Sequence, residues 1–248
     1  MPLYNSHGQI VSPAAQLPLP AGPAAAELQR TLAGLPGHHP LQARGEGGYM
    51  RYRQMTVDEM LLENRVVFLV GEINEASGYG VIMRLLYLQS IRKDQDIMLY
   101  INSPGGHVDD TLAIYDTMKF LSCDVQTFCI GQAMSGAAIV LAAGAKGKRY
   151  ALPHAKVMIH QPFGGIYGQT ADIAIQAEEI LKTKDTLIEL LAKLSGQTRE
   201  RVAEDQERDK YFDAHAARDY GLVDEVLEEG DVKKKEEIAT QQESRPQR

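Results

Sequence analysis

The sequence predicts an α/β protein in which helices pack on a largely parallel sheet. Short apolar runs alternate along the chain with segments whose apolar residues recur at helical spacing. Strands that alternate with helices form right-handed crossovers and parallel strand pairs. Of the 248 residues, 44% are hydrophobic, which is ordinary for a globular protein and enough to bury a substantial core. We see no internal repeat and no second folded domain.

The first 48 residues read as an arm outside the folded domain. Residues 1–46 hold seven of the eleven prolines, together with alanine and glycine. Such a composition buries too little apolar surface to offset chain entropy, so we expect disorder. The arm fits a removable pro-segment and a partner-facing tail equally well. The domain of residues 49–228 follows, and Thr56 with Glu59 fits a capping box at its first helix.

In the first half of the domain, continuous apolar runs alternate with segments whose apolar residues recur at helical spacing. Val66–Val70 is a continuous apolar run ended by Gly71, which is typical of a strand buried on both faces, and Asp96–Ile101 is a second run of this kind. The segments between the runs have mostly helical spacing. The expected elements are strands at 66–70, 96–101 and 125–130, and helices around 81–88, around 112–121 and from 135 onward.

The second half contains the longest predicted helix. Apolar residues recur at spacings of three, four and seven from about 170 to 195, and Gly196 ends the stripe. At 1.5 Å per residue this helix is about 38 Å long, so it can project from the domain. Residues 229–248 form a charged tail that we expect to be flexible. The other expected elements are strands at 148–152, 157–160, 210–213 and 222–227, and helices at 198–205, capped by Thr198, and 214–220.

Composition excludes several classes of function. The net charge is −7 and the basic residues are scattered, so we expect no nucleic-acid partner. No apolar run approaches the roughly 20 residues that span a bilayer, and no secretory leader is visible, so we expect a cytoplasmic protein without a membrane partner. The two cysteines, Cys123 and Cys129, read as reduced structural thiols, and no spacing suggests a metal site.

Ser135 is the candidate nucleophile, because it stands where a strand-like run meets a helix of small residues. Backbone N–H groups at a helix start lack intrahelical partners and favour negative charge. The alternative is that Ser135 is only an N-cap, a common position for serine. A nucleophilic serine needs a base, a group that orients the base, and donors for an oxyanion.

Candidates for these further roles occur elsewhere in the chain. His160 stands at the carboxyl end of an apolar strand, where open α/β sheets place their sites, and His107 is the rival base. Asp209 is one of 33 acidic residues and could equally be a surface charge. The pair Gly105-Gly106 could present backbone N–H groups to a ligand or form a tight turn. The residues around Ser135 do not match the nucleophile elbow of α/β-hydrolases.

Seven segments resemble the ClpP family, the proteolytic subunit of the ATP-dependent Clp protease, and the match runs from about residue 62 to residue 228. These segments are Tyr100–Gly106, Ile130–Ser135, Leu141–Arg149, Ala151–Pro153, Met158–Pro162, Glu207–Asp209 and Tyr220–Asp224.

The resemblance implies a serine endopeptidase of the crotonase-like (spiral β/α) fold. It gives Ser135 the role of nucleophile, His160 that of general base and then acid, and Asp209 that of orienting the imidazole. The backbone N–H groups of Gly105 and Gly136 would form the oxyanion hole. No cofactor is implied for this subunit, because ATP is used by the partner unfoldase.

The resemblance also implies an assembly of two stacked heptameric rings around a chamber. A hexameric AAA+ unfoldase such as ClpX, ClpA or ClpC would feed it unfolded polypeptide. Residues 161–195 would form a handle, a glycine-rich strand and a long helix that interleave between the rings. Glu207 and Arg208 would lie at the ring contact, and Tyr100, Phe120 and Leu227 would line the surface pocket where unfoldase loops dock, although each of these three could be ordinary core.

One departure from the family pattern concerns the residue after the nucleophile, and two alternatives remain. Family members usually have Ser-Met-Gly, whereas this chain has Ser135-Gly-Ala137. The backbone N–H of residue 136 can donate to the oxyanion whichever side chain the residue carries, so we expect peptide hydrolysis to be retained. The alternatives are a non-catalytic ring subunit of a mixed barrel and a crotonase-type acyl-CoA enzyme, which would have no reactive serine.

Overall fold

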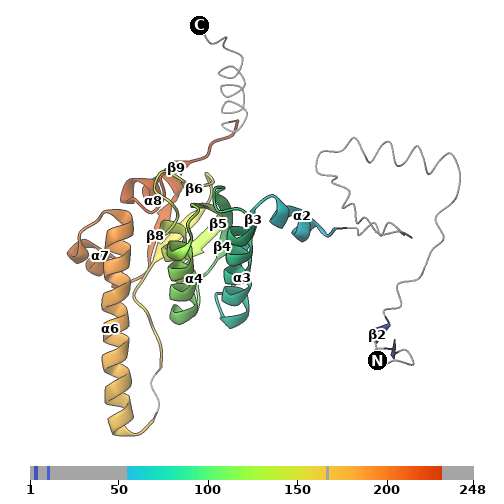
Figure 1. Cartoon of the computed structure of the whole chain (residues 1–248). Coiled ribbons are helices and arrows are strands. Elements are labelled where there is room, and N and C mark those ends of the chain that lie inside the picture. Colours follow the sequence, from blue (N-terminus) through green and yellow to red (C-terminus); the bar gives the residue numbers. More distant parts are fainter. Residues whose placement is uncertain (1–2, 5–9, 12–54, 166–167, 231–248) are drawn as a thin grey trace, which may run out of the picture. The chain divides into compact units, whose positions relative to one another are not determined.

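The computed structural model describes residues 3–4, 10–11, 55–165 and 168–230 (Figure 1). They belong to two units, Met1–Arg53 and Gln54–Arg248. In the first unit, β1 (Leu3–Tyr4) and β2 (Ile10–Val11) form an antiparallel pair. The rest of the predicted arm and the tail from residue 231 lie outside the described residues, so their predicted disorder stays a prediction.

From residue 56 onward, the second unit contains each strand and helix that periodicity predicts. The largest differences concern two strands: the one expected at 125–130 continues to Met134, and the one expected at 222–227 is reduced to two residues. Thr56 and Glu59 form the predicted capping box. The elements are α2 (Val57–Glu63), β3 (Val66–Val70), α3 (Glu75–Ile91), β4 (Ile97–Ser103), α4 (Val108–Phe120), β5 (Val125–Met134), α5 (Gly136–Ala142), β6 (Arg149–Ala151), β7 (Lys156–Ile159), α6 (Thr170–Ser195), α7 (Arg199–Asp205), β8 (Lys210–Asp213), α8 (Ala214–Tyr220) and β9 (Glu225–Val226).

The sheet is parallel except at one strand pair. Strands β3, β4, β5, β6 and β9 lie side by side in this order, all parallel, and β7 pairs in parallel with the last part of β5. Strand β8 is antiparallel to β7. The alternation of strands and helices therefore predicts this sheet as largely parallel, and the β7–β8 pair is its one antiparallel pair among the described strands.

Among the described residues, helices cover only one face of this sheet. Helices α3 and α4 lie side by side (Figure 1), and Val67 and Leu69 of β3 join their apolar residues in one core. On the opposite face, Phe68 and Val70 are 40% and 57% exposed. The expectation that β3 is buried on both faces is therefore wrong for the single chain, because no described helix packs on that face.

Helix α6 extends well beyond the rest of its unit, as the length of its apolar stripe predicts (Figure 1). Its buried residues, Leu187, Ile188, Leu191 and Ser195, all lie in its last three turns. Gly196, at a φ of 79°, ends it in the left-handed conformation. The glycine-rich strand expected before α6 is absent from the described residues of 161–169, since no neighbouring strand pairs with that segment.

No helix in the described part of the chain is long and apolar enough to cross a membrane.

Candidate active site

Ser135 occupies a sharp turn between β5 and α5. Its φ is 53°, a value that residues other than glycine seldom adopt. Its N–H donates to the carbonyl of Met158 in β7 at 2.8 Å, which fixes the turn against the neighbouring strand. The hydroxyl makes no cap bond to α5. The N-cap alternative therefore does not account for this serine, since its side chain points to another partner.

That partner is His160. Strands β5 and β7 are in register at Met134 and Met158, so the residues that follow these strands meet at one edge of the sheet. His160 Nε2 lies 2.9 Å from Ser135 Oγ. The rival base, His107, is exposed, and its Nδ1 lies 3.3 Å from the carboxylate of Asp110. The structure thus brings His160, and not His107, into hydrogen-bond contact with the serine.

Asp209 reaches the other side of the imidazole because β8 returns antiparallel along β7. Ile159 pairs with Lys210, so the residue after β7 lies beside the residue before β8. Asp209 Oδ1 is 3.1 Å from His160 Nδ1. Lys210, next in the chain, forms an ion pair with the buried carboxylate of Asp205 and so anchors the start of β8.

The three side chains form one continuous hydrogen-bond relay. With the imidazole neutral, Nδ1–H donates to Asp209 and Nε2 accepts the hydroxyl proton of Ser135. The His160 side chain is 15% exposed, whereas Asp209 is 56% exposed in the single chain. The arrangement can move a proton away from Ser135 Oγ and hold the resulting imidazolium beside a carboxylate.

The predicted oxyanion donor Gly105 is already engaged. Its N–H donates to Ser103 Oγ at 3.1 Å, and a Cβ at this position would lie 2.5 Å from the carbonyl of Met134. Gly105 therefore lets the loop after β4 pack directly against the Ser135 turn. In this respect the structure differs from the prediction.

The neighbouring Gly106 is better placed to donate. Ile73 donates to the carbonyl of Gly105 and accepts from the N–H of His107, which directs the Gly106 N–H to the other side of the loop. Gly106 and Gly136 both line the hollow that contains Ser135. Neither N–H has an acceptor among the described residues. The family resemblance gave this role to Gly105, but which of the two adjacent glycines can donate depends on which N–H the bridge to Ile73 turns toward the serine.

The glycine after the nucleophile also has a structural explanation. A Cβ on Gly136 would overlap Oγ1 of Thr111, a buried residue of α4. The Thr111 hydroxyl donates to the carbonyl of His107 at 2.9 Å, which holds it in place. Thr111 thus fills the space that a side chain at residue 136 would need, a relation that the sequence does not show.

The hollow beside Ser135 has mostly apolar walls. It also contains Gln206, which the sequence did not single out and which no motif marks. The lining residues are Gly106, Val108, Thr111, Ser135, Gly136, Ile139, Ile159, His160, Pro162, Leu187, Leu191 and Gln206.

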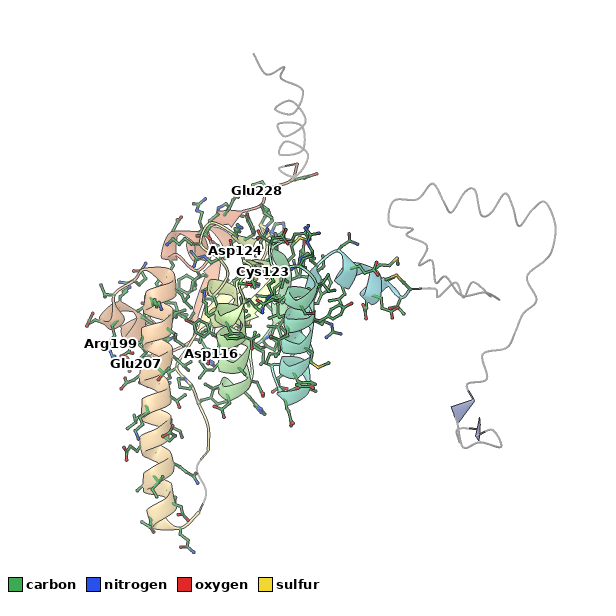
Figure 2. The ribbon with its side chains drawn as sticks, viewed as in Figure 1. Asp116, Cys123, Asp124, Arg199, Glu207 and Glu228 are labelled. Carbon is green, nitrogen blue, oxygen red and sulfur yellow. The ribbon has the colours of Figure 1, made fainter. Side chains whose placement is uncertain are left out.

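The predicted contact residues lie away from the relay or at its margin. Glu207 and Arg208 are exposed in the loop between α7 and β8, and Figure 2 labels Glu207. Phe120, the last residue of α4, is 79% exposed, so it is not core. Tyr100 and Leu227 are half-buried. The structure does not test their predicted contacts, which stay predictions.

Tyr100 belongs to a row of aromatic rings on the uncovered face of the sheet. The row crosses β3, β4, β5 and β6 through Phe68, Tyr100, Phe128 and Tyr150, with neighbouring ring centroids 5.5, 4.7 and 4.8 Å apart. Because parallel register places these residues side by side, the row is a property of the sheet that no single segment reveals.

The cysteines do not contribute to the site. Both are buried and free of disulfides. Burial raises the pKa of the Cys129 thiol to about 11, so it stays protonated at neutral pH. Among the described residues, no group of three or more His, Cys, Asp or Glu side chains is arranged to hold a metal ion.

Comparison with known proteins gives a consistent result. A sequence model described as Clp protease matches residues 49–230. A relative from Rhodopirellula baltica, named ATP-dependent Clp protease proteolytic subunit 1, is 52% identical over 190 residues. This alignment covers 77% of the present chain and 84% of the relative.

Proposed function

Since the chain belongs to the Clp protease family, we propose that it is a proteolytic subunit of an ATP-dependent Clp protease and cleaves peptide bonds through Ser135, His160 and Asp209. The observation that carries the proposal is the relay from Ser135 Oγ through the imidazole to the Asp209 carboxylate. A non-catalytic ring subunit would have no need of a serine held in a strained turn against a histidine.

The reaction proceeds through an acyl-enzyme. His160 Nε2 takes the hydroxyl proton as Ser135 Oγ attacks the substrate carbonyl carbon, and Asp209 stabilises the imidazolium. The imidazolium then gives this proton to the leaving amine as the carbon–nitrogen bond breaks. A water molecule, deprotonated by the same histidine, then attacks the carbonyl carbon of the acyl-enzyme ester. As this second tetrahedral intermediate collapses, its bond to Ser135 Oγ breaks and the imidazolium returns the proton to Ser135.

The oxyanion of each tetrahedral intermediate needs hydrogen-bond donors that are in place beforehand. We assign this role to the N–H groups of Gly106 and Gly136. They line the same hollow as Ser135 and have no acceptor within the described chain. Gly105 supports them by packing against the serine turn.

The subunit functions in an oligomeric assembly with an unfoldase partner. In our proposal two heptameric rings of crotonase-like subunits stack through the handle of residues 161–195, with Glu207 and Arg208 at the ring contact. The apolar side chains exposed on α6 support this, since Ile175 and Leu181 are 68% and 62% exposed in the single chain.

The unfoldase would dock on the uncovered face of the sheet. Tyr100, Phe120 and Leu227 would contact the unfoldase, and the aromatic row through Tyr100 supplies a continuous apolar surface on that face. The partner, an AAA+ enzyme such as ClpX, ClpA or ClpC, would use the ATP, so this subunit would need no cofactor. We place the assembly in the cytoplasm.

Hydrolysis of a short fluorogenic peptide tests the proposal. The wild type should cleave the peptide without help, whereas Ser135→Ala should lower the rate by at least about 10³-fold. A folded protein substrate should be degraded only with an unfoldase and ATP. Equal rates for the wild type and Ser135→Ala would exclude Ser135 as the nucleophile, and binding of a CoA thioester without peptidase activity would favour the acyl-CoA alternative.

A further inference from the structure

The position of the Asp209 carboxylate depends on the loop that carries it. This loop runs from Gln206, which follows α7, to Lys210, the first residue of β8. The Asp209 side chain is 56% exposed, and its carboxylate makes one hydrogen bond in the described chain, to His160 Nδ1. A carboxylate with a single bond needs a fixed backbone, because a displacement of about 1 Å near a reacting group can cost on the order of 100-fold in rate.

Gln161, the residue directly after His160, ties this loop to the end of β7 twice. Its backbone N–H donates to the carbonyl of Gln206 at 2.7 Å, and its side-chain Nε2 donates to the carbonyl of Glu207 at 3.1 Å. The proposed base and the loop that carries its orienting carboxylate are therefore joined through one residue.

Lys184 of α6 determines which way the Gln161 amide points. Its Nζ donates to Gln161 Oε1 at 2.9 Å. An ammonium group only donates and a backbone carbonyl only accepts, so the amide turns its oxygen to α6 and its nitrogen to Glu207. This bond also accounts for a lysine in the apolar stripe of α6, four residues from Ile180 and from Ile188.

We propose that Gln161 is a positioning residue that acts through Asp209, a role that presupposes the proposed peptidase function. Its two bonds hold the loop so that the Asp209 carboxylate meets His160 Nδ1, and Lys184 keeps the amide in the orientation that this requires. Gln161 does not line the hollow beside Ser135, so it acts on the chemical step and not on substrate binding.

Gln161→Met tests this role, because methionine keeps the length of the side chain and forms neither side-chain bond. With a fluorogenic peptide, kcat should fall about 10- to 100-fold while KM stays within about twofold of the wild type. Lys184→Met removes only the bond to Gln161 Oε1 and should lower kcat about threefold. The rates are compared between particles of the same native mass.

A background of Asp209→Ala separates positioning from a merely structural role. Without a carboxylate to place, Gln161→Met should lower the rate by no more than about twofold further. Because Asp209→Ala is itself slow, the rate at which a fluorophosphonate labels Ser135 is the measure in this background.

Gln197→Met is the matched control. Gln197 Nε2 donates to the carbonyl of Tyr220 at 3.0 Å, so this variant loses a comparable bond to a backbone carbonyl, away from the relay. It should lower the thermal midpoint about as much as Gln161→Met does and leave kcat unchanged.

An unchanged kcat in Gln161→Met, or the same loss of rate with and without the Asp209 carboxylate, overturns the role of Gln161 and leaves the peptidase assignment intact. If the wild type cleaves no peptide, the proposed function fails and this inference fails with it. Should Gln161→Met not fold, Lys184→Met decides: a loss of rate that disappears in the Asp209→Ala background supports the role, and an unchanged kcat overturns it.

Discussion

Ser135 holds a backbone conformation that its side chain disfavours, and its neighbours explain how this is maintained. Its N–H is bonded to Met158, Gly105 packs against it, and Gly136 follows it without a side chain. Strained residues of this kind cost on the order of 1–3 kcal/mol and persist only where the surroundings hold them in place. Here the surroundings are the ends of β4, β5 and β7.

The contact between Gly136 and Thr111 predicts a pair of compensating substitutions. Gly136→Ala alone should lower the thermal midpoint and reduce peptidase activity, because its Cβ would overlap Thr111 Oγ1. Adding Thr111→Ala removes that atom and should restore a large part of both. Thermal unfolding and peptide cleavage of the two single variants and the double variant measure this coupling. Strictly additive effects would contradict the packing relation.

Residue-level reasoning from the sequence reached part of this site. Ser135 and His160 follow recognisable strand ends, so their types and positions predict a nucleophile and a base. Asp209 stands out from other acidic residues only through family resemblance, because its contact with His160 depends on the antiparallel return of β8. Gln206 and Thr111 belong to no recognisable motif. They lie near Ser135 because α4 and the end of α7, which are distant from Ser135 in the sequence, border the same hollow.

At the scale of elements, a buried ion pair centred on Arg149 holds the C-terminal ends of two helices against the sheet. Arg149 of β6 is 3% exposed and binds Asp224 through Nη2 at 2.6 Å and Nε at 2.9 Å. The same guanidinium donates to the carbonyls of Leu194, near the end of α6, and of Gly221, after α8. The pair therefore fixes α6 and α8 to the strand between them.

This pair predicts a dependence of stability on pH. Burial by itself would raise the pKa of Asp224, but the bonds and charge of Arg149 outweigh it and hold the pKa below its usual range. A depressed carboxyl pKa stabilises the fold above the unfolded value of about 4, and this contribution is lost as pH falls through the folded-state pKa. Thermal midpoints measured from pH 7 downward should therefore decrease below about pH 4.

Asp224→Asn tests the source of this dependence. It leaves Arg149 buried without its counter-charge and should destabilise the fold by about 3 kcal/mol at neutral pH. The decrease of the midpoint in acid should also become shallower. Asp219→Asn is the matched control, because its ion pair with Arg218 is exposed and its loss should have a much smaller effect. Equal effects of the two substitutions would contradict the account.

Periodicity predicts the elements well and their surroundings poorly. The bounds of α6 follow from its apolar stripe and Gly196, and those of β3 from a continuous apolar run. The same run suggests burial on both faces of β3, yet Phe68 is 40% exposed. An apolar residue that a partner subunit or unfoldase would cover has the same local pattern as a core residue, so sequence alone does not separate them.

For the whole molecule, the projecting half of α6 predicts the association of two rings. Ile175 is exposed in the single chain, so Ile175→Glu should preserve the fold and its thermal transition but weaken ring stacking. Native mass spectrometry should then show particles of half the wild-type mass. Gln176→Glu places the same new charge at a polar, exposed position of α6 and should leave the wild-type mass unchanged. Full-mass particles of Ile175→Glu would contradict the role of this helix.

Covalent labelling tests most directly whether Ser135 is a nucleophile activated by His160. The purified protein is treated with a fluorophosphonate, digested, and analysed by mass spectrometry to locate the adduct. We predict one adduct per chain, on Ser135, and none in Ser135→Ala or His160→Ala. An adduct on another residue, or undiminished labelling of Ser135→Ala, would contradict the account.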